Sequence, residues 1–241
     1  MSTPTLTAHA PESRGQPIRI GGLGLPAALA LPARAVGLVI APATGQGAPE
    51  IGRQIRLGLH LNRLGLGTLL FDPAPPGDAA ASQVLELARL SAQVTHTLRW
   101  LKEQIGLRHL PIGLLGLRRG AGAALLAAAR EPGRIQALVT QGGRPDLAGA
   151  QLARVQAPTL MLLDGSNPDE LMRGQQASQT LSGPRRLEVL TPSLGDSRDP
   201  EHFDGALRLA GHWFLNHLAA RERPGTGHPP TDETPCRQPG S

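Results

Sequence analysis

The chain has 241 residues, of which 40% are hydrophobic, 18% charged and 2% aromatic, and this length and balance predict one compact globular domain. The net charge of +5 comes almost entirely from arginine, since Lys102 is the only lysine. The arginines are scattered and there is no tyrosine. Both features argue against a nucleic-acid-binding surface, which gathers basic residues on one face beside aromatic side chains.

The single cysteine, Cys236, excludes an intramolecular disulfide and a site made of several thiolates. The most apolar stretch near the N-terminus, residues 21–42, is interrupted by Pro26, Pro32 and Arg34, so it predicts neither a signal peptide nor a transmembrane helix. These observations predict a cytoplasmic protein that binds no membrane.

The ends of the chain differ in composition from its middle. Residues 1–16 and 221–241 are rich in Pro, Ser, Thr and Gly and have few large apolar residues, so burial cannot offset the entropy of ordering them. We therefore expect disordered tails on either side of one domain over residues 17–220.

Within that domain, short apolar runs alternate with longer segments of helical spacing. The runs that predict buried strands are 35–41, 67–71, 111–116, 135–140, 159–164 and 185–190, and residues 18–31 predict a hairpin that turns at Gly21 and Gly22. The helical segments are 50–64, 83–105, 119–130, 169–180 and 204–220. This alternation predicts an α/β fold with a mostly parallel sheet, an N-terminal hairpin and helices on both faces. Ligands of such sheets bind beyond the carboxyl ends of the strands.

A glycine-rich turn follows the predicted strand 111–116. The sequence PIGLLGLRRGAGAALL, residues 111–126, places Gly116 and Gly120 two residues before and after Arg118. Small residues at these two positions are typical of a nucleophile elbow, where a strand turns sharply into a helix and presents one side chain in a strained conformation. Arg118 occupies the central position of this predicted elbow.

At this turn the chain resembles the dienelactone-hydrolase-like branch of the α/β-hydrolase superfamily. The resemblance extends over about residues 18–218 and implies the α/β-hydrolase fold. Besides the elbow, the segments that carry it in order are LGLGTLLFDPAPP (64–76), TLRWLKEQ (97–104), RIQALVTQGGRPDLA (134–148), VQAPTLMLLDG (155–165) and GALRLAGHWFLNHL (205–218).

The resemblance also implies where a catalytic triad would stand, and here all three positions are substituted. The nucleophile, acid and base positions carry Arg118, Asn167 and Asp196. A protonated guanidinium has no lone pair for attack, and an asparagine cannot supply the charge that stabilises an imidazolium. In the loop 41–47, which would supply an oxyanion contact, Pro42 has no N–H to donate. We therefore expect a pseudo-hydrolase whose role is small-anion binding or a protein interaction.

Two interpretations of Arg118 follow. Arg118 and Arg119 at a helix N-terminus favour a phosphate or carboxylate, with Thr44 and Gly45 of the loop 41–47 as further candidate ligand contacts. Alternatively, Arg118 is neutralised inside the protein, and because the nucleophile and base of a triad lie within hydrogen-bond reach, we predict a salt bridge between Arg118 and Asp196.

Other chemistries receive less support from the residues. An active hydrolase of esters or related carbonyl compounds would need substitutes, for which the candidates are His202 as base, Asp164 as acid and Ser166 or Ser193 as hydroxyl, although the stretch 196–204 reads more simply as a polar surface loop. The glycines at 113, 116, 120 and 122 do not match a dinucleotide-binding motif. His212 and His217 do not share a helix face, and no metal-ligand spacing occurs. We expect no metal or cofactor, and a protein partner or a second copy of the chain remains open.

Overall fold

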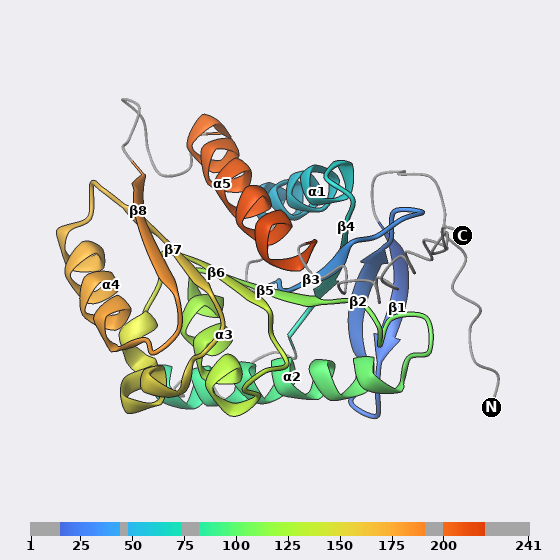
Figure 1. The fold of residues 1–241 in the computed structure, drawn as a ribbon, viewed down its shortest axis with the longest axis horizontal. Helices are drawn as coiled ribbons and strands as arrows, with labels where there is room; N and C mark the ends of the chain where they lie inside the picture. Colours follow the sequence, from blue (N-terminus) through green and yellow to red (C-terminus); the bar gives the residue numbers. More distant parts are fainter. Residues whose placement is uncertain (1–14, 44–47, 74–81, 191–199, 220–241) are drawn as a thin grey trace, which may run out of the picture.

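The computed structural model describes residues 15–43, 48–73, 82–190 and 200–219. This part of the chain forms one eight-stranded sheet in the order β1-β2-β4-β3-β5-β6-β7-β8 (Figure 1). The strands are β1 (Gln16–Ile20), β2 (Leu25–Ala30), β3 (Gly37–Pro42), β4 (Leu66–Phe71), β5 (Ile112–Leu117), β6 (Ala137–Gln141), β7 (Thr159–Asp164) and β8 (Arg185–Leu190). The hairpin β1–β2 and the pair β2–β4 are antiparallel, and every other pair is parallel. The expected α/β architecture is confirmed.

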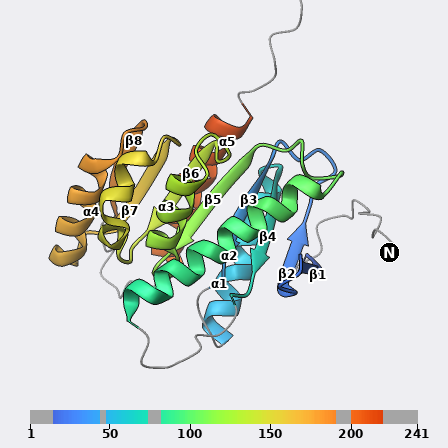
Figure 2. The ribbon, with the colours of Figure 1, turned by 90° about the horizontal axis from the view of Figure 1, so that it is seen from below.

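Helices cover both faces of the sheet. On one face lie α1 (Ala48–Arg63) and α5 (Pro200–Leu218) (Figure 1). On the other lie α2 (Gln83–Glu103), α3 (Arg119–Arg130), the 3₁₀ segment η1 (Pro145–Arg154) and α4 (Pro168–Thr180), as Figure 2 shows for the three α-helices. Because the central strands are covered on both sides, they are apolar along their whole length rather than in alternation.

Neighbouring residues of one strand contribute to different halves of the core. On β5, Leu114 packs in the layer with α2 and α3, whereas Leu115 packs in the layer with α1 and α5. Leu138 and Val139 divide in the same way on β6. This follows from the two-residue period of a strand, which directs successive side chains to opposite faces. The two layers hold β5 and β6 firmly at the centre of the sheet, where the elbow begins.

Two details differ from the sequence prediction. Residues 145–154 were not expected to be helical, yet they form 3₁₀ turns with a kink at Gly149, where φ is 53°. Helix α5 begins at Pro200, four residues before the expected start, so residues 200–204 are not the polar loop that was predicted. Proline suits the first position of a helix because its missing N–H would have no acceptor there.

The described ranges carry two further findings. None of their helices is long and apolar enough to cross a membrane. They also contain no group of three or more His, Cys, Asp or Glu side chains arranged to hold a metal ion.

Candidate functional site

Arg118 stands at the sharp turn between β5 and α3, as the sequence predicts for an elbow. Its φ and ψ are 50° and −112°, and it is the one non-glycine residue with positive φ in the described part of the chain. Its N–H donates to the carbonyl of Gln141 at 2.8 Å, and its own carbonyl accepts from Ala121 N at 3.0 Å. An L-residue pays roughly 1–3 kcal/mol for such a conformation, so the surrounding contacts must hold it in place.

Gly116 makes the turn sterically possible. A Cβ atom at this position would lie 2.6 Å from the carbonyl oxygen of Gly120 and 2.8 Å from the Cα of Ala121. At Gly116 the end of β5 therefore lies directly against the backbone of the first turn of α3 and the Cβ atom of Ala124. The predicted role of glycine two residues before the elbow centre is confirmed, with Gly120 contributing its carbonyl on the helix side.

Four arginines lie at the carboxyl edge of the sheet, and three of them are paired. Arg119 contacts Glu86 of α2 at 3.4 Å, Arg144 binds Asp146 at 2.7 Å, and Arg173 lies 4.0 Å from Asp146 and 3.9 Å from Asp169. The hydrogen bond with Arg144 is the main reason why the pKa of Asp146 is lowered. Arg118 is exposed, and its guanidinium makes no hydrogen bond or ion pair with any described residue.

Asn167, at the acid position, is the residue immediately before α4 and caps that helix. Its side-chain oxygen accepts from the N–H of Glu170 at 3.1 Å, which makes it the N-cap of the helix, and Pro168 occupies the first helical turn. The sequence Asn-Pro-Asp-Glu carries a recognisable capping-box signal, an Asx residue followed three residues later by glutamate. The side chain of Asn167 thus has a local structural role.

Glu170 is the residue of the site that sequence reasoning missed. Its half-buried carboxylate accepts the backbone N–H of Asp164 at 2.9 Å, instead of reaching back to the N-cap as in a regular capping box. Burial raises the pKa of Glu170, and the nearby charge of Arg118 partly opposes that rise. The capping-box pattern could have identified Glu170 as a helix-start residue, but only the fold places it near Arg118.

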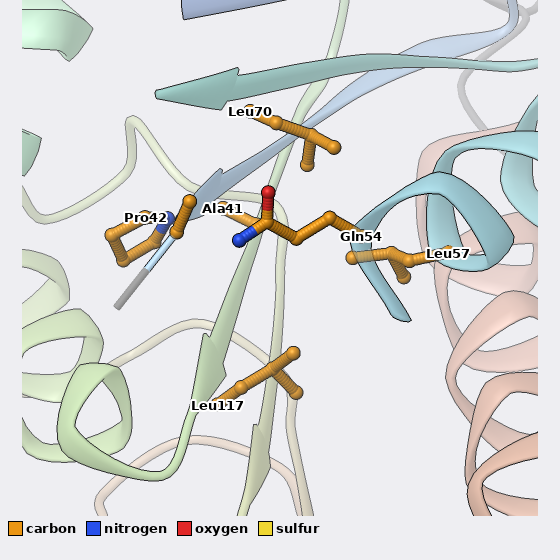
Figure 3. A pocket seen from close by; sticks show the side chains of 7 residues that line it. Ala41, Pro42, Gln54, Leu57, Leu70 and Leu117 are labelled. Carbon is orange, nitrogen blue, oxygen red and sulfur yellow. The ribbon is translucent and has the colours of Figure 1, made fainter. Parts of the chain in front are cut away.

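A small hollow lies beside the elbow, at the carboxyl ends of β3 and β5 (Figure 3). Its lining residues are Ala41, Pro42, Ala43, Gln54, Leu57, Leu70 and Leu117. Six of these seven residues are apolar. Figure 3 shows the amide of Gln54, from α1, reaching between Pro42 and Leu70. The hollow offers an apolar surface with one polar group, next to the residue that precedes Arg118.

The remaining candidates divide into those that the structure describes and those that it does not. The hydroxyl of Ser166 donates to Asp164 Oδ1 at 2.6 Å, and the N–H of Ser166 donates to the same oxygen at 2.9 Å. This is the pattern of a local turn, and no described imidazole stands beside that hydroxyl. Thr44, Gly45, Ser193, Asp196 and the side chain of His202 lie outside the described residues, so the Arg118–Asp196 salt bridge stays a prediction.

No family model matches the chain. Two curated proteins from Mycobacterium tuberculosis are each 32% identical to it over 212 residues, and both are provisionally named phosphoribosyl transferases. The match covers 86% of this chain and 48% of each relative. The chain therefore spans about half the length of the curated relatives that it matches.

Solved structures agree on the fold. A dienelactone hydrolase from Anabaena variabilis superposes with a TM-score of 0.77 at 27% identity, over 87% of this chain and all of that one. Est1E from Butyrivibrio proteoclasticus gives 0.66 at 17% identity, covering 86% and 100% of the two chains. A dienelactone hydrolase-like promiscuous phosphotriesterase from metagenomic libraries gives 0.62 at 17% identity, covering 84% and 98%.

Proposed function

We propose that this chain is a non-hydrolytic member of the dienelactone-hydrolase-like branch of the α/β-hydrolase superfamily, whose fold it shares, and that it binds a small anion at the elbow. The observation that carries the proposal is Arg118, which stands in the strained elbow conformation with its guanidinium exposed and unpaired among the described residues. The backbone that presents a nucleophile is retained, while the side chain that it presents is a cation.

The same observation argues against hydrolysis by the usual route. A guanidinium stays protonated and cannot attack a carbonyl carbon. Loss of the nucleophile alone removes about 10⁶-fold of the rate in a comparable triad. Asn167 is engaged as a helix cap, and an amide would not stabilise an imidazolium in any case.

Anion binding is favoured by what surrounds Arg118. The N–H groups of Arg119 and Gly120 begin α3, so they have no acceptor within the helix, and Arg118 at the N-cap position supplies no side-chain cap. Free N–H groups and the helix dipole at this end attract negative charge. The names of the curated relatives add a ligand to test first, a phosphate ester of ribose, although those names belong to proteins about twice as long.

Two measurements test this proposal. Wild-type protein incubated with a fluorophosphonate probe and with a panel of p-nitrophenyl esters should show neither labelling nor turnover. Sulfate and ribose phosphate should raise the melting temperature in a concentration-dependent manner, because a ligand that binds only the folded state stabilises it. Arg118→Gln should abolish that rise, whereas Arg108→Gln, in an exposed turn before β5, should leave it unchanged.

Each outcome decides between the two classes of function. Labelling of a serine would overturn the non-hydrolytic proposal and favour an active hydrolase that uses other residues. The absence of any anion effect, or an equal effect in the Arg118→Gln variant, would overturn anion binding at the elbow.

A further inference from the structure

Strand β8 forms one end of the sheet, and its outer side is open in the described part of the chain. Figure 2 shows β8 at one end of the sheet and the hairpin β1–β2 at the other. β8 pairs with β7 residue by residue from Arg185 to Leu190, without a bulge, and no described strand pairs with its other side. A regular edge strand of this kind offers unpaired N–H and C=O groups to a further strand.

The hydrogen bonds to β7 show which residues of β8 direct their backbone groups outward. At one end the N–H of Thr159 donates to the carbonyl of Pro184 at 2.9 Å. At the other end the N–H of Gly165 donates to the carbonyl of Leu190 at 3.0 Å. Because this direction alternates along a strand, all even-numbered residues of β8 direct their backbone groups to β7. The residues that direct theirs outward are Arg185, Leu187 and Val189.

The two edges of the sheet differ in how well they can accept a further strand. β1 contains Pro17, which has no N–H to donate, and proline is one of the residues that protect an edge strand from association. β8 contains neither proline nor glycine, and Val189 on this strand is 47% exposed. Of the two edges, β8 is therefore the one suited to pairing.

We propose that β8 binds β8 of a second copy of this chain in antiparallel orientation, about a two-fold axis at Leu187, so that the two sheets become one. In this register Leu187 lies opposite Leu187 of the second copy, and Arg185 lies opposite Val189. All three residues direct their backbone groups outward, so each of these N–H and C=O groups finds a partner across the axis.

The charged residues of β8 select this register. Arg186 and Glu188 share one face of the strand, where they form an ion pair with each other. In the proposed register Arg186 lies opposite Glu188 of the second copy, in a non-hydrogen-bonded pair, where the side chains of antiparallel strands approach most closely. If the axis moved by one residue, Arg186 would face Arg186 or Glu188 would face Glu188, and like charges in opposite positions destabilise a sheet. The charge pattern of β8 is thus complementary to itself.

The proposed dimer is independent of the proposed anion binding. Strands β5 to β8 are parallel, so their carboxyl ends lie at the same edge of the sheet. Antiparallel pairing of β8 therefore directs the carboxyl edges of the two copies in opposite directions, and each elbow with its Arg118 belongs to one copy alone. Either proposal can fail without the other.

Charge reversal tests the pairing. The wild-type protein should sediment at twice the 25.2 kDa of one chain in analytical ultracentrifugation. Arg186→Glu and Glu188→Arg each place like charges opposite each other at two symmetric positions, so each should raise the dissociation constant of the dimer about tenfold or more. The double variant that carries both changes restores opposite charges and should dimerise as the wild-type protein does.

A mixture of the two single variants provides the sharpest comparison. In a mixed dimer each glutamate of the Arg186→Glu variant faces an arginine of the Glu188→Arg variant. The equimolar mixture should therefore associate about tenfold more tightly than either variant alone, and this association also shows that both variants are folded. The control is Arg19→Glu, which reverses an exposed charge on β1 at the other edge and should leave the dissociation constant unchanged.

Amide hydrogen exchange followed by NMR identifies the strand edge directly. In the dimer the amides of Leu187 and Val189 should be protected, and this protection should fall on dilution and in the Arg186→Glu variant. The amides of Arg186 and Glu188 are directed to β7, so they should stay protected in the monomer as well.

Each outcome supports or overturns the pairing of β8. A wild-type protein that sediments as a monomer at every concentration up to its solubility limit would overturn it. So would a dimer that the single charge reversals leave unchanged, or a mixture that associates no better than its components. Amides of Leu187 and Val189 that exchange equally fast in dimer and monomer would show that a different surface joins the two copies.

Discussion

The carbonyl group of Arg118 lies directly against the backbone of Gly143. A Cβ atom on Gly143 would lie 2.7 Å from the carbonyl carbon of Arg118 and would overlap its oxygen, and Gly143 itself has φ of 82°. Together with the hydrogen bond from Arg118 N to Gln141, this contact fixes the elbow against the end of β6. The strain at Arg118 is thus held by a neighbouring strand and the turn that follows it.

We therefore expect Gly143→Ala to destabilise the protein through two effects, the clash with Arg118 and the left-handed backbone. Gly149→Ala separates them, because Gly149 also has positive φ, 53°, but has open space around it. Backbone strain alone should cost Gly149→Ala roughly 1–3 kcal/mol, and Gly143→Ala should cost more. Urea unfolding of both variants measures the difference, and equal losses would show that the contact with Arg118 contributes nothing.

Gly116→Ala should be strongly destabilising as well, because its Cβ would meet backbone atoms of Gly120 and Ala121, which cannot move without displacing α3. We expect a loss above about 2 kcal/mol, in the range of overpacked cores. As a comparison, Gly52→Ala lies within α1 with nothing near its Cβ position and should gain about 0.5–1 kcal/mol from helix propensity. A Gly116→Ala protein with normal stability would mean that the elbow can relax.

The elbow could be predicted from sequence because its determinants are local. Gly116, Arg118 and Gly120 lie within five residues, and the apolar runs on either side identify the strand and the helix. Glu170 could not be placed near Arg118 in the same way. The two residues are brought together by the parallel order β5-β6-β7 and by the turn 142–143, and a single sequence does not reveal which turns meet.

Short and irregular elements could not be predicted from the sequence either. Residues 145–154 form 3₁₀ turns that are too short to show a clear helical period, and Gly149 interrupts them. At the start of α5, charged residues after Pro200 indicate a loop by composition, although proline at a first helical position is equally a start signal. The N-cap role of Asn167 was not predicted either, because the resemblance assigns this residue to the acid position of the triad.

The raised pKa of Glu170 has a consequence for stability. Burial disfavours the charged carboxylate, so Glu170 binds a proton more readily in the folded state than in the unfolded chain, where the pKa of a glutamate is 4.5. The stability of the folded state should therefore fall as the pH rises from about 4.5 through the raised pKa of Glu170. Glu170→Gln removes the penalty and keeps the hydrogen bond to Asp164, so at neutral pH it should be as stable as the wild-type protein or more so. Comparison of urea midpoints at acidic and neutral pH tests this, and a clear loss at neutral pH would contradict it.

The lowered pKa of His60, on α1, makes stability depend on pH in the opposite direction. Burial is the main cause of its lowered pKa. Its Nε2 is buried and has no hydrogen-bond partner among the described residues, and it lies 3.1 Å from where a Cβ of Gly211 would lie. The unfolded chain binds a proton near the ordinary value of 6.5 while the folded state resists it, so stability should be lost as the pH falls through that value.

His60→Leu should reduce this acid sensitivity, as followed by thermal unfolding between about pH 8 and pH 5.5. His109→Gln, at an exposed position, should retain it. An unchanged pH profile for His60→Leu would show that other groups dominate the acid response.

Arg118→Ser provides the last prediction, because it returns a hydroxyl to the elbow without returning the rest of the machinery. A serine hydroxyl needs an adjacent base to become a nucleophile, and the acid and base positions carry Asn167 and Asp196. The single variant should therefore show no esterase activity. Asn167→Asp preserves the helix cap, since aspartate caps as well as asparagine. Only the triple variant with Asn167→Asp and Asp196→His should gain activity, and that activity should be weak. Hydrolysis of p-nitrophenyl acetate by the Arg118→Ser variant alone would show that a base is already in place, and His202→Gln in that background would then identify whether it is His202.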